Sequence, residues 1–190
     1  MIEHEKKLLL SKKQYEYLFN NYCTTCSDIT VIKQVNYYFD TDDFIMNRRN
    51  ITCRIRLKNG KYVGTMKQHS SGTDNSTETQ VNVKNGILEN DFTEAGLKLQ
   101  GELVTKRYIL HRDSSSEVVL DKNEYLGYED YELEIEYSDG HEKEACDIYD
   151  KILTEISQIH PYPKDNVTFL YVPSKSTRFF KRKSILTKAH

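Results

Sequence analysis

Residues 131–137 read Tyr-Glu-Leu-Glu-Ile-Glu-Tyr and alternate strictly between carboxylates and apolar or aromatic side chains. A period of two is that of a β-strand, in which successive side chains point to opposite faces. Glu132, Glu134 and Glu136 therefore share one face of the predicted strand. Because three neighbouring carboxylates repel one another unless cations lie between them, we expect this face to be matched by positive charge.

A similar alternation opens the chain, where Glu3, Glu5 and Lys7 occupy every second position. In a strand these three side chains share one face, while Ile2 and Leu8 lie on the other. A face with charges of both signs suits a site for a metal ion and an anion. The alternative is an N-terminal strand with a solvated outer face, and this stretch alone does not decide between the two.

A β-hairpin is predicted around Asn59-Gly60, a strong signal for a two-residue type I′ turn. Such a turn fixes the register of its strands, so that Lys58 lies opposite Lys61 and each following pair is set. The register collects three cations on one face: Arg54, Arg56 and Lys67. A cationic face this regular favours an anion site over a solvated hairpin surface.

The remaining pattern predicts further strands and covering helices. Strands are expected at residues 31–41, 78–82, 103–111 and 117–123, and helices at residues 11–22, 86–99 and 142–159. Ser11 is the expected N-cap of the first helix. Arg107 and Asp121 are candidate functional positions on two of the strands. The basic tail, residues 174–183, is by composition alone a solvated extension.

Composition limits the classes of function. A chain of 190 residues fits one domain, residues 1–190, and its formal net charge of −2 gives no bulk attraction to nucleic acid or to an anionic membrane. No apolar run of spanning length and no secretory signal is recognisable, so we expect a cytoplasmic protein. Cys23 and Cys26 form a Cys-x-x-Cys pair without the other ligands of a zinc site and are interpreted as free thiols.

About eight strands without a regular βα alternation predict an α+β, mainly-β fold, with an eight-stranded antiparallel sheet closed into a barrel and helices packed outside. Inside such a barrel, basic groups would bind a polyanion and carboxylates would bind Mg²⁺ or Mn²⁺. This distribution suits phosphoryl transfer, in which a protein positions a polyphosphate and neutralises developing charge. Neither a P-loop nor a Ser-His-Asp set is present in the sequence.

The charged positions also follow a recognisable order along nearly the whole chain. The ordered set comprises Glu3-x-Glu5-x-Lys7, Tyr38-Phe39-Asp40-Thr41, Arg54-x-Arg56, Lys67, Glu78, Arg107, Asp121, Glu132-x-Glu134-x-Glu136, and Lys175 with Arg178. It resembles the CYTH family, the triphosphate tunnel metalloenzymes, and within it the small bacterial single-domain members often named adenylate cyclases. The resemblance implies an eight-stranded tunnel, dependence on a divalent metal, and hydrolysis or cyclisation of a triphosphate.

The resemblance also implies roles for individual residues. The implied metal ligands are Glu3, Glu5, Glu132 and Glu134, with Asp121 and Glu136 as further candidates. The implied phosphate-binding residues are Lys7, Arg54, Arg56, Lys67, Arg107, Lys175 and Arg178. The implied catalytic residues are Glu5, Lys7, Glu134 and Lys175. Two positions depart from the family pattern: Gln80 stands where many members have a carboxylate, which leaves the number of metal ions open, and His4 replaces an apolar residue.

The expected function is therefore a metal-dependent triphosphatase. Inorganic triphosphate is the expected small-molecule substrate, because no separate element is identified that would grip a base. Adenylate cyclase is the alternative, and a non-catalytic polyphosphate- or nucleotide-binding module is a third. The third ranks lowest, since a pure anion binder should avoid the carboxylates. No nucleic-acid or membrane partner is expected, and the sequence leaves monomer and homodimer open.

Overall fold

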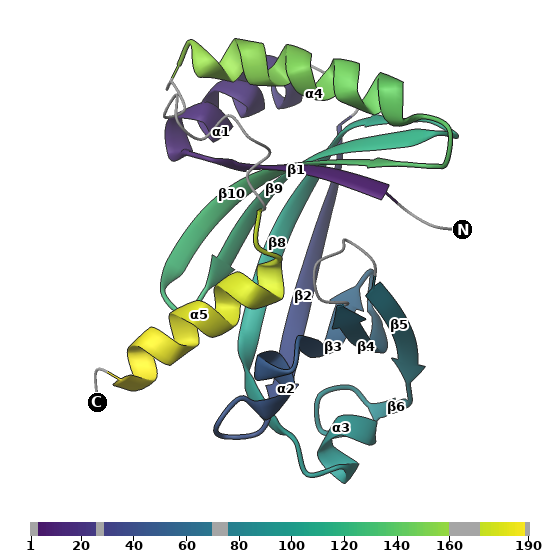
Figure 1. The fold of residues 1–190 in the computed structure, drawn as a ribbon, viewed down its shortest axis with the longest axis vertical. Helices are drawn as coiled ribbons and strands as arrows, with labels where there is room; N and C mark the ends of the chain where they lie inside the picture. The colour runs from purple at the N-terminus through teal and green to yellow at the C-terminus, as the bar shows by residue number, and fades with distance from the viewer. Residues whose placement is uncertain (1–3, 26–28, 70–75, 160–171, 189–190) are drawn as a thin grey trace. The chain divides into compact units, whose positions relative to one another are not determined.

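The structure, a computed structural model, describes residues 4–25, 29–69, 76–159 and 172–188. It has a mainly-β α+β fold (Figure 1). Its elements are β1 (His4–Leu10), α1 (Lys12–Leu18), a π-helical turn (Phe19–Cys23), β2 (Thr30–Asp40), α2 (Ile45–Arg48), β3 (Ile51–Lys58), β4 (Lys61–His69), β5 (Ser76–Val81), β6 (Val83–Asn85), β7 (Glu89–Asn90), α3 (Asp91–Glu94), β8 (Lys98–Arg112), β9 (Ser116–Tyr125), β10 (Tyr128–Tyr137), α4 (Glu142–Ser157) and α5 (Lys175–Lys188). None of the described helices is long and apolar enough to cross a membrane.

Eight strands form one large sheet in the order β1-β10-β9-β8-β2-β3-β4-β5, and β6 and β7 form a small second sheet. The pairs β1/β10, β2/β3, β3/β4 and β4/β5 are antiparallel. The predicted large antiparallel sheet is thus confirmed. Within the part of the chain that the structure describes, no pairing closes this sheet into a barrel, so the closed barrel stays a prediction.

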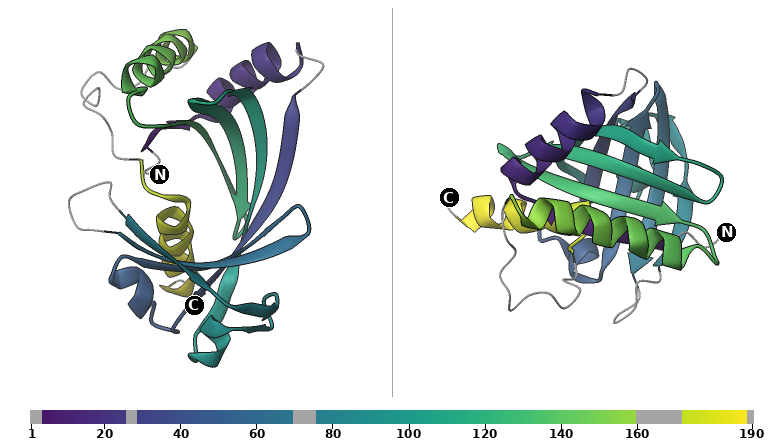
Figure 2. Two further views of the ribbon diagram at one scale, coloured as in Figure 1. Left: turned by 90° about the vertical axis from the view of Figure 1, so that its right-hand side faces the viewer. Right: turned by 90° about the horizontal axis from the view of Figure 1, so that it is seen from above.

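The chain divides into two compact units. The first unit comprises Met1–Ile32, Lys106–Asn123 and Glu129–Val172, and the second unit comprises Lys33–Thr105, Glu124–Tyr128 and Pro173–His190. In the first unit, α1 and α4 lie over one face of the strands (Figure 2). Their apolar residues pack with those of the strands into one core, which includes Leu18, Leu120, Leu133, Ile135 and Ile156. The helices therefore cover the apolar face of these strands.

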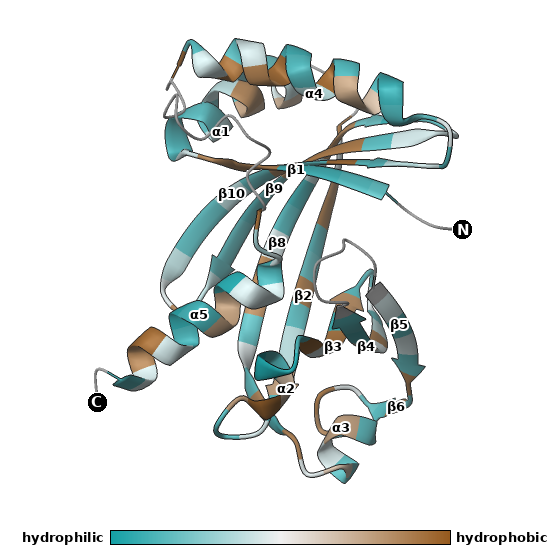
Figure 3. Cartoon of the chain, in the orientation of Figure 1, coloured by the Kyte–Doolittle hydropathy of each residue, from teal (hydrophilic) through white to brown (hydrophobic). Residues whose placement is uncertain are grey.

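Local signals explain the two covering helices. The Ser11 hydroxyl accepts a hydrogen bond from the Gln14 amide (3.3 Å) and the Gln14 side chain accepts one from the Ser11 amide (2.8 Å), which is a capping box. The predicted start of the first helix is confirmed. Helix α4 carries hydrophobic and hydrophilic residues along its whole length (Figure 3) and buries Ala145, Ile152 and Ile156. Its apolar spacing is that of a helix with one buried face.

In the second unit, the hairpin β3–β4 has the predicted register. Lys58 pairs with Lys61, and Arg54 pairs with Thr65. Asn59 and Gly60 have φ angles of 51° and 74°, as the two central residues of a type I′ turn require. On the apolar face of β3, Cys53 and Ile55 are fully buried in a core with Phe39 and Phe92. The opposite face, which carries the cations, is therefore held in place by a packed core behind it.

The predicted helix over residues 86–99 is wrong. The segment contains the two-residue strand β7 and the single helical turn α3, and β8 already begins at Lys98. Gly86 and Gly96 have φ angles of 54° and 78°, in the left-handed region that breaks an α-helix. The Asn90 side chain caps α3 by accepting hydrogen bonds from the amides of Phe92 and Thr93. The two glycines at positive φ thus determine the conformation of this segment, although its apolar residues have helical spacing.

For the basic tail, composition alone suggested a solvated extension, whereas the family resemblance implied a functional segment, and the structure shows an anchored helix. Residues 175–188 form α5, and the Ser174 hydroxyl accepts a hydrogen bond from the Thr177 amide at its start. Phe179 and Phe180 are 0% and 3% exposed and pack in a cluster with Tyr38, Leu103 and Tyr125 of the second unit. Two adjacent aromatic residues therefore anchor a helix whose overall composition is strongly basic.

Candidate functional site

An acidic cluster lies in the first unit, on the polar face of β9 and β10. Asp121, Glu132 and Glu134 are 0%, 0% and 4% exposed, and each offers a carboxylate oxygen within 4.8 Å of the others. Carboxylate oxygens are the ligands that hard divalent cations prefer. Burial of three carboxylates is costly unless positive charge compensates them, so the donor set fits a divalent metal ion.

Arg107 of β8 lies among these carboxylates. Its Nε and Nη2 atoms donate to the two oxygens of Asp121 at 2.9 and 2.8 Å, in a bidentate pair. It also donates to Glu134 through Nη2, and to Glu136 through Nη1 at 3.3 Å. Burial acts to lower the pKa of Arg107, but the three carboxylates outweigh it and raise that pKa. Arg107, predicted to bind phosphate, is therefore engaged with predicted metal ligands.

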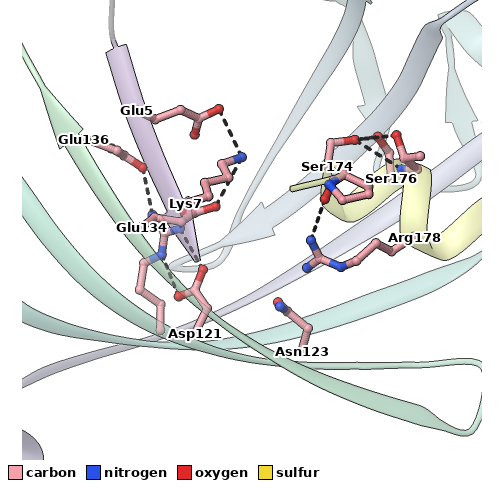
Figure 4. A network of polar contacts seen from close by, with 12 residues as sticks. Glu5, Lys7, Asp121, Asn123, Glu134, Glu136, Ser174, Ser176 and Arg178 are labelled. Carbon is pink, nitrogen blue, oxygen red and sulfur yellow. Dashed lines mark hydrogen bonds and ion pairs between the residues drawn. The ribbon is translucent and has the colours of Figure 1, made fainter. Parts of the chain in front are cut away.

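Lys7 of β1 supplies a second positive charge. Its Nζ lies 3.0 Å from Glu5 Oε1 and 3.5 Å from Glu134 Oε1 (Figure 4). The strand register places Lys7 opposite Glu134 and Glu5 opposite Glu136. Burial alone would lower the pKa of Lys7, yet the charges of Glu134 and Glu5 raise it, so its ammonium group is held charged. Five of the predicted site residues on β1, β9 and β10 thus meet in one network, whereas Glu3 lies outside the described residues.

Two of the carboxylates hold protons more tightly than usual. Burial raises the pKa of Glu134, and Asp121 adds to the shift while Lys7 opposes it. Burial likewise raises the pKa of Glu136, against the opposing charge of Arg107. A carboxylate must lose its proton to ligate a metal ion, so a metal ion at this cluster would compete with protons.

A cationic face lies in the second unit, on the opposite side of β3 and β4 from the core. The register forms rows of side chains across the strands: Asn36, Arg56 and Val63 in one row, Tyr38, Arg54, Thr65 and Gln80 in the next, and Thr52, Lys67 and Glu78 in the third. A cavity of about 410 Å³ opens on this face. Its lining includes Arg54, Arg56, Lys58, Lys61 and Glu78. The cavity has the charge that a phosphate chain requires.

Neighbouring polar groups orient the two arginines. Arg54 Nη2 donates to Thr65 Oγ1 at 3.3 Å and lies 3.5 Å from Glu78 Oε1. Arg56 Nε donates to Asn36 Oδ1 at 2.9 Å. These contacts hold both guanidinium groups on the polar face of β3. The predicted residues Arg54, Arg56 and Lys67 therefore share one face.

The start of α5 is tied to β3 within the same unit. Thr52 Oγ1 lies 3.0 Å from Ser176 Oγ, and Ser174 Oγ lies 2.9 Å from the same atom. Arg178 Nη1 donates to the Pro173 carbonyl at 2.6 Å (Figure 4). Lys175 is the first residue of the helix. The two tail residues that were predicted to bind phosphate thus stand at the anchored end of α5.

Sequence reasoning missed several polar residues of these faces. Lys58 and Lys61 were used only to set the hairpin register, although their charge and position signalled a continuation of the cationic face. Asn36 was passed over because a neutral amide carries no charge signal. Its position two residues before Tyr38, on the alternation of β2, is the signal that could have found it.

The chain is similar to known proteins along most of its length. The profile of the CYTH domain matches residues 1–171. YjbK of Bacillus subtilis strain 168, which has the provisional name of triphosphatase, is 31% identical over 97% of this chain and 98% of its own length. A crystal structure from Bacillus halodurans with the provisional name of adenylate cyclase is 26% identical, with a TM-score of 0.65 over 94% of this chain and 97% of that one. HpAC1 from Hippeastrum, provisionally an adenylyl cyclase and described with a dominant triphosphatase activity, shares the fold at 18% identity, with a TM-score of 0.65 over 95% of this chain and 96% of that one.

Proposed function

Because the chain belongs to the CYTH domain family, we propose that it is a divalent-metal-dependent triphosphatase that hydrolyses inorganic triphosphate to diphosphate and phosphate. The observation that carries the proposal is the buried cluster of Asp121, Glu132 and Glu134, which a pure anion binder would not need. The cationic face of β3 and β4 supports it, since its charge fits a phosphate chain. The name of the relative YjbK points to the same activity.

The chain offers a residue for each part of such a reaction. Asp121, Glu132 and Glu134 would hold Mg²⁺ or Mn²⁺, with Glu5, Glu136 and Glu3 as further ligands. When bound, the metal ion neutralises charge on the phosphoryl oxygens. Arg54, Arg56 and Lys67 would bind phosphate oxygens, with Lys7, Arg107, Lys175 and Arg178 as further candidates. Glu5 or Glu134 would orient a water whose oxygen attacks the terminal phosphorus while the bond to the bridging oxygen breaks and diphosphate leaves.

We further propose that the eight-stranded sheet closes into the predicted tunnel around the substrate. The order of the strands and the alternation of charged and apolar residues along them support closure, because a barrel hides a charged inner face. In such a tunnel, the metal-binding carboxylates and the cationic face would act on one triphosphate. The substrate would also be shielded from bulk water, which strengthens each electrostatic contact.

A phosphate-release assay tests this function. The wild-type protein is incubated with inorganic triphosphate, nucleoside triphosphates and thiamine triphosphate, each with Mg²⁺ and with Mn²⁺. We expect metal-dependent release from inorganic triphosphate, and a loss of about 100-fold or more in kcat/KM in Glu134→Gln and Arg56→Ala, because removal of a group that stabilises transition-state charge costs this much. A wild-type protein that is inert towards every substrate with both metals would rule the proposal out.

Exposed residues serve as matched controls. Glu129→Gln changes a carboxylate on the same strand as Glu134, and Arg48→Ala removes an arginine that is 63% exposed. Both control variants should keep wild-type activity.

Adenylate cyclase is the second candidate, because a relative of known structure has that provisional name. In that reaction the ribose 3′ hydroxyl replaces water as the attacking group. Cyclic AMP and diphosphate formed from ATP, instead of phosphate, would identify this activity. Tight binding of inorganic triphosphate without turnover would instead indicate a non-catalytic binding module.

A further inference from the structure

Asn36 is a fully buried polar residue on the cationic face, in the same row as Arg56. Its Oδ1 accepts a hydrogen bond from Arg56 Nε at 2.9 Å. Because a guanidinium group can only donate hydrogen bonds, this contact fixes the orientation of the Asn36 amide. The Nδ2 group therefore points away from the Arg56 Nε donor and needs an acceptor elsewhere.

The structure provides no acceptor for Asn36 Nδ2 among the residues that it describes. Most buried polar groups in proteins have a hydrogen-bond partner, and a buried donor without one lowers stability. Arg54 Nε, in the adjacent row, is a second buried donor without a partner among the same residues. An anion with several oxygen atoms, bound at this cationic face, could accept hydrogen bonds from both of these donors.

Asn90, in the same unit, is a buried asparagine with a structural role and serves for comparison with Asn36. It is 1% exposed, and its Oδ1 accepts hydrogen bonds from the amides of Phe92 and Thr93. Its Nδ2 donates to the Gly86 carbonyl at 3.2 Å. Both ends of the Asn90 amide thus have partners inside the protein, whereas within the described part of the chain only the oxygen end of the Asn36 amide has one.

We propose that Asn36 is a substrate-binding residue whose Nδ2 donates a hydrogen bond to a phosphoryl oxygen of the triphosphate, while its Oδ1 orients Arg56. The inference rests on the proposed function and assigns a further residue to that site. A neutral amide is suited to both tasks. A carboxylate at this position could orient Arg56 equally well, but it would have no donor for phosphate and would repel the phosphate chain.

The test compares Asn36→Asp, Asn36→Ala and Asn36→Leu with the wild-type protein and with Asn90→Ala. We measure kcat and KM for inorganic triphosphate with Mg²⁺, and binding of inorganic triphosphate by calorimetry in EDTA. We expect the three Asn36 variants to bind triphosphate about tenfold to 100-fold more weakly, since one hydrogen bond to a charged group contributes a difference of this size. We expect the largest loss in Asn36→Asp.

Stability separates a binding role from a structural one. Asn36→Leu removes a buried donor that has no acceptor among the described residues, but it also removes the acceptor of the Arg56 Nε hydrogen bond. These two changes oppose each other, so its urea midpoint should stay close to that of the wild type. Asn90→Ala removes a satisfied cap, so its midpoint should fall while KM stays unchanged. If Asn36→Asp does not fold, Asn36→Ala and Asn36→Leu still decide the question.

Two results would overturn the inference while leaving the proposed function intact. One is wild-type affinity for triphosphate in the folded Asn36 variants. The other is a fall in the urea midpoint of Asn36→Leu comparable to that of Asn90→Ala, with KM unchanged, which would assign Asn36 a structural role. A wild-type protein that neither binds nor hydrolyses triphosphate would instead overturn the proposed function, and this inference with it.

Discussion

At the scale of single residues, Arg107 is the side chain on which the acidic cluster depends. It is 12% exposed and contacts Asp121, Glu134 and Glu136. Arg107→Gln leaves buried carboxylates without this cation, and breaking a buried ion pair by removing one partner costs about 3–5 kcal/mol. We therefore expect a loss of this size in the free energy of unfolding in EDTA, and a smaller loss in Mg²⁺, because a bound metal ion supplies positive charge to the same carboxylates.

Urea denaturation of the two proteins with and without Mg²⁺ checks this prediction. The matched control is Arg112→Gln on the same strand, where the arginine is 54% exposed and pairs with Glu117. An exposed pair contributes about 0–1 kcal/mol, so the control should be nearly neutral. Equal stability of Arg107→Gln and the wild type in EDTA would contradict the role assigned to Arg107.

Glu136 should affect how the free energy of unfolding depends on pH. Burial raises its pKa above the ordinary value of 4.5, so the native state binds this proton more tightly than the unfolded chain does. The resulting stabilisation is complete below the unfolded pKa and is lost as the pH rises through the higher native pKa. In EDTA, the free energy of unfolding should therefore decline less steeply above pH 4.5 in Glu136→Gln than in the wild type.

Urea denaturation over a series of pH values, at constant ionic strength, measures the two slopes. Glu129→Gln on the same strand is a control of opposite sign, because hydrogen bonds from Tyr131 and Lys122 lower the pKa of Glu129. Indistinguishable slopes for Glu136→Gln and the wild type would show that Glu136 has no unusual proton affinity.

The sequence predicted which charged residues share a face of a strand, but not which of them form ion pairs. The alternation of β10 placed Glu132, Glu134 and Glu136 on one face without any structure. The pairing of Arg107 with Asp121 was not predicted, because the turn over residues 112–116 joins the two strands but does not fix their register as an Asn-Gly turn does. For Asn36, the alternation of β2 could have indicated its face, but the lack of an acceptor for its Nδ2 among the described residues is visible only in the folded structure.

At the scale of elements, α5 shows how two aromatic residues decide the position of a basic helix. Phe179 is fully buried, and its ring centroid lies 4.8 Å from that of Tyr38. Phe179→Ala should lower the free energy of unfolding by about 3–5 kcal/mol, as is usual for a buried phenylalanine. We also expect α5 to become sensitive to protease and KM for triphosphate to rise, because Lys175 and Arg178 lose their fixed position.

Limited proteolysis, urea denaturation and steady-state kinetics test these three effects. Ile185→Ala is the control on the same helix, since Ile185 is 54% exposed. It should leave all three measurements unchanged. An unchanged KM in a folded Phe179→Ala protein would show that the position of α5 does not matter for the substrate.

The incorrect helix prediction and the tail helix that the sequence left open both have physical causes. Apolar residues at helical spacing over residues 86–99 were given more weight than the two glycines, although glycine at positive φ ends a helix. In the tail, charge dominated the composition and concealed the Phe179-Phe180 pair. The hairpin was predicted correctly, including its register, because a two-residue Asn-Gly turn fixes which residues lie opposite each other.

At the scale of the whole molecule, the large antiparallel sheet was predictable because its strands alternate with a period of two and are joined by short turns. The division into two compact units was not predictable, since the boundary between them falls within single strands, namely β2, β8, β9 and β10. Strand pairing between segments far apart in the sequence is the information that alternation alone lacks.

The proposed tunnel makes a prediction about binding. The acidic cluster belongs to the first unit and the cationic face to the second. If one triphosphate engages both, the metal ion and the phosphate chain must each strengthen binding of the other by the same factor. We expect Mg²⁺ to bind about 5–150-fold more tightly in the presence of a non-hydrolysable triphosphate analogue, a typical range for coupled sites.

Calorimetric titration of Mg²⁺ with and without the analogue, and of the analogue with and without Mg²⁺, measures the factor in both directions. Arg56→Ala should weaken binding of the analogue and reduce the coupling, while Arg48→Ala should change neither. Equal Mg²⁺ affinity in the presence and absence of the analogue would mean that the two faces act independently. In that case the acidic cluster and the cationic face would not share a substrate, whatever each of them binds alone.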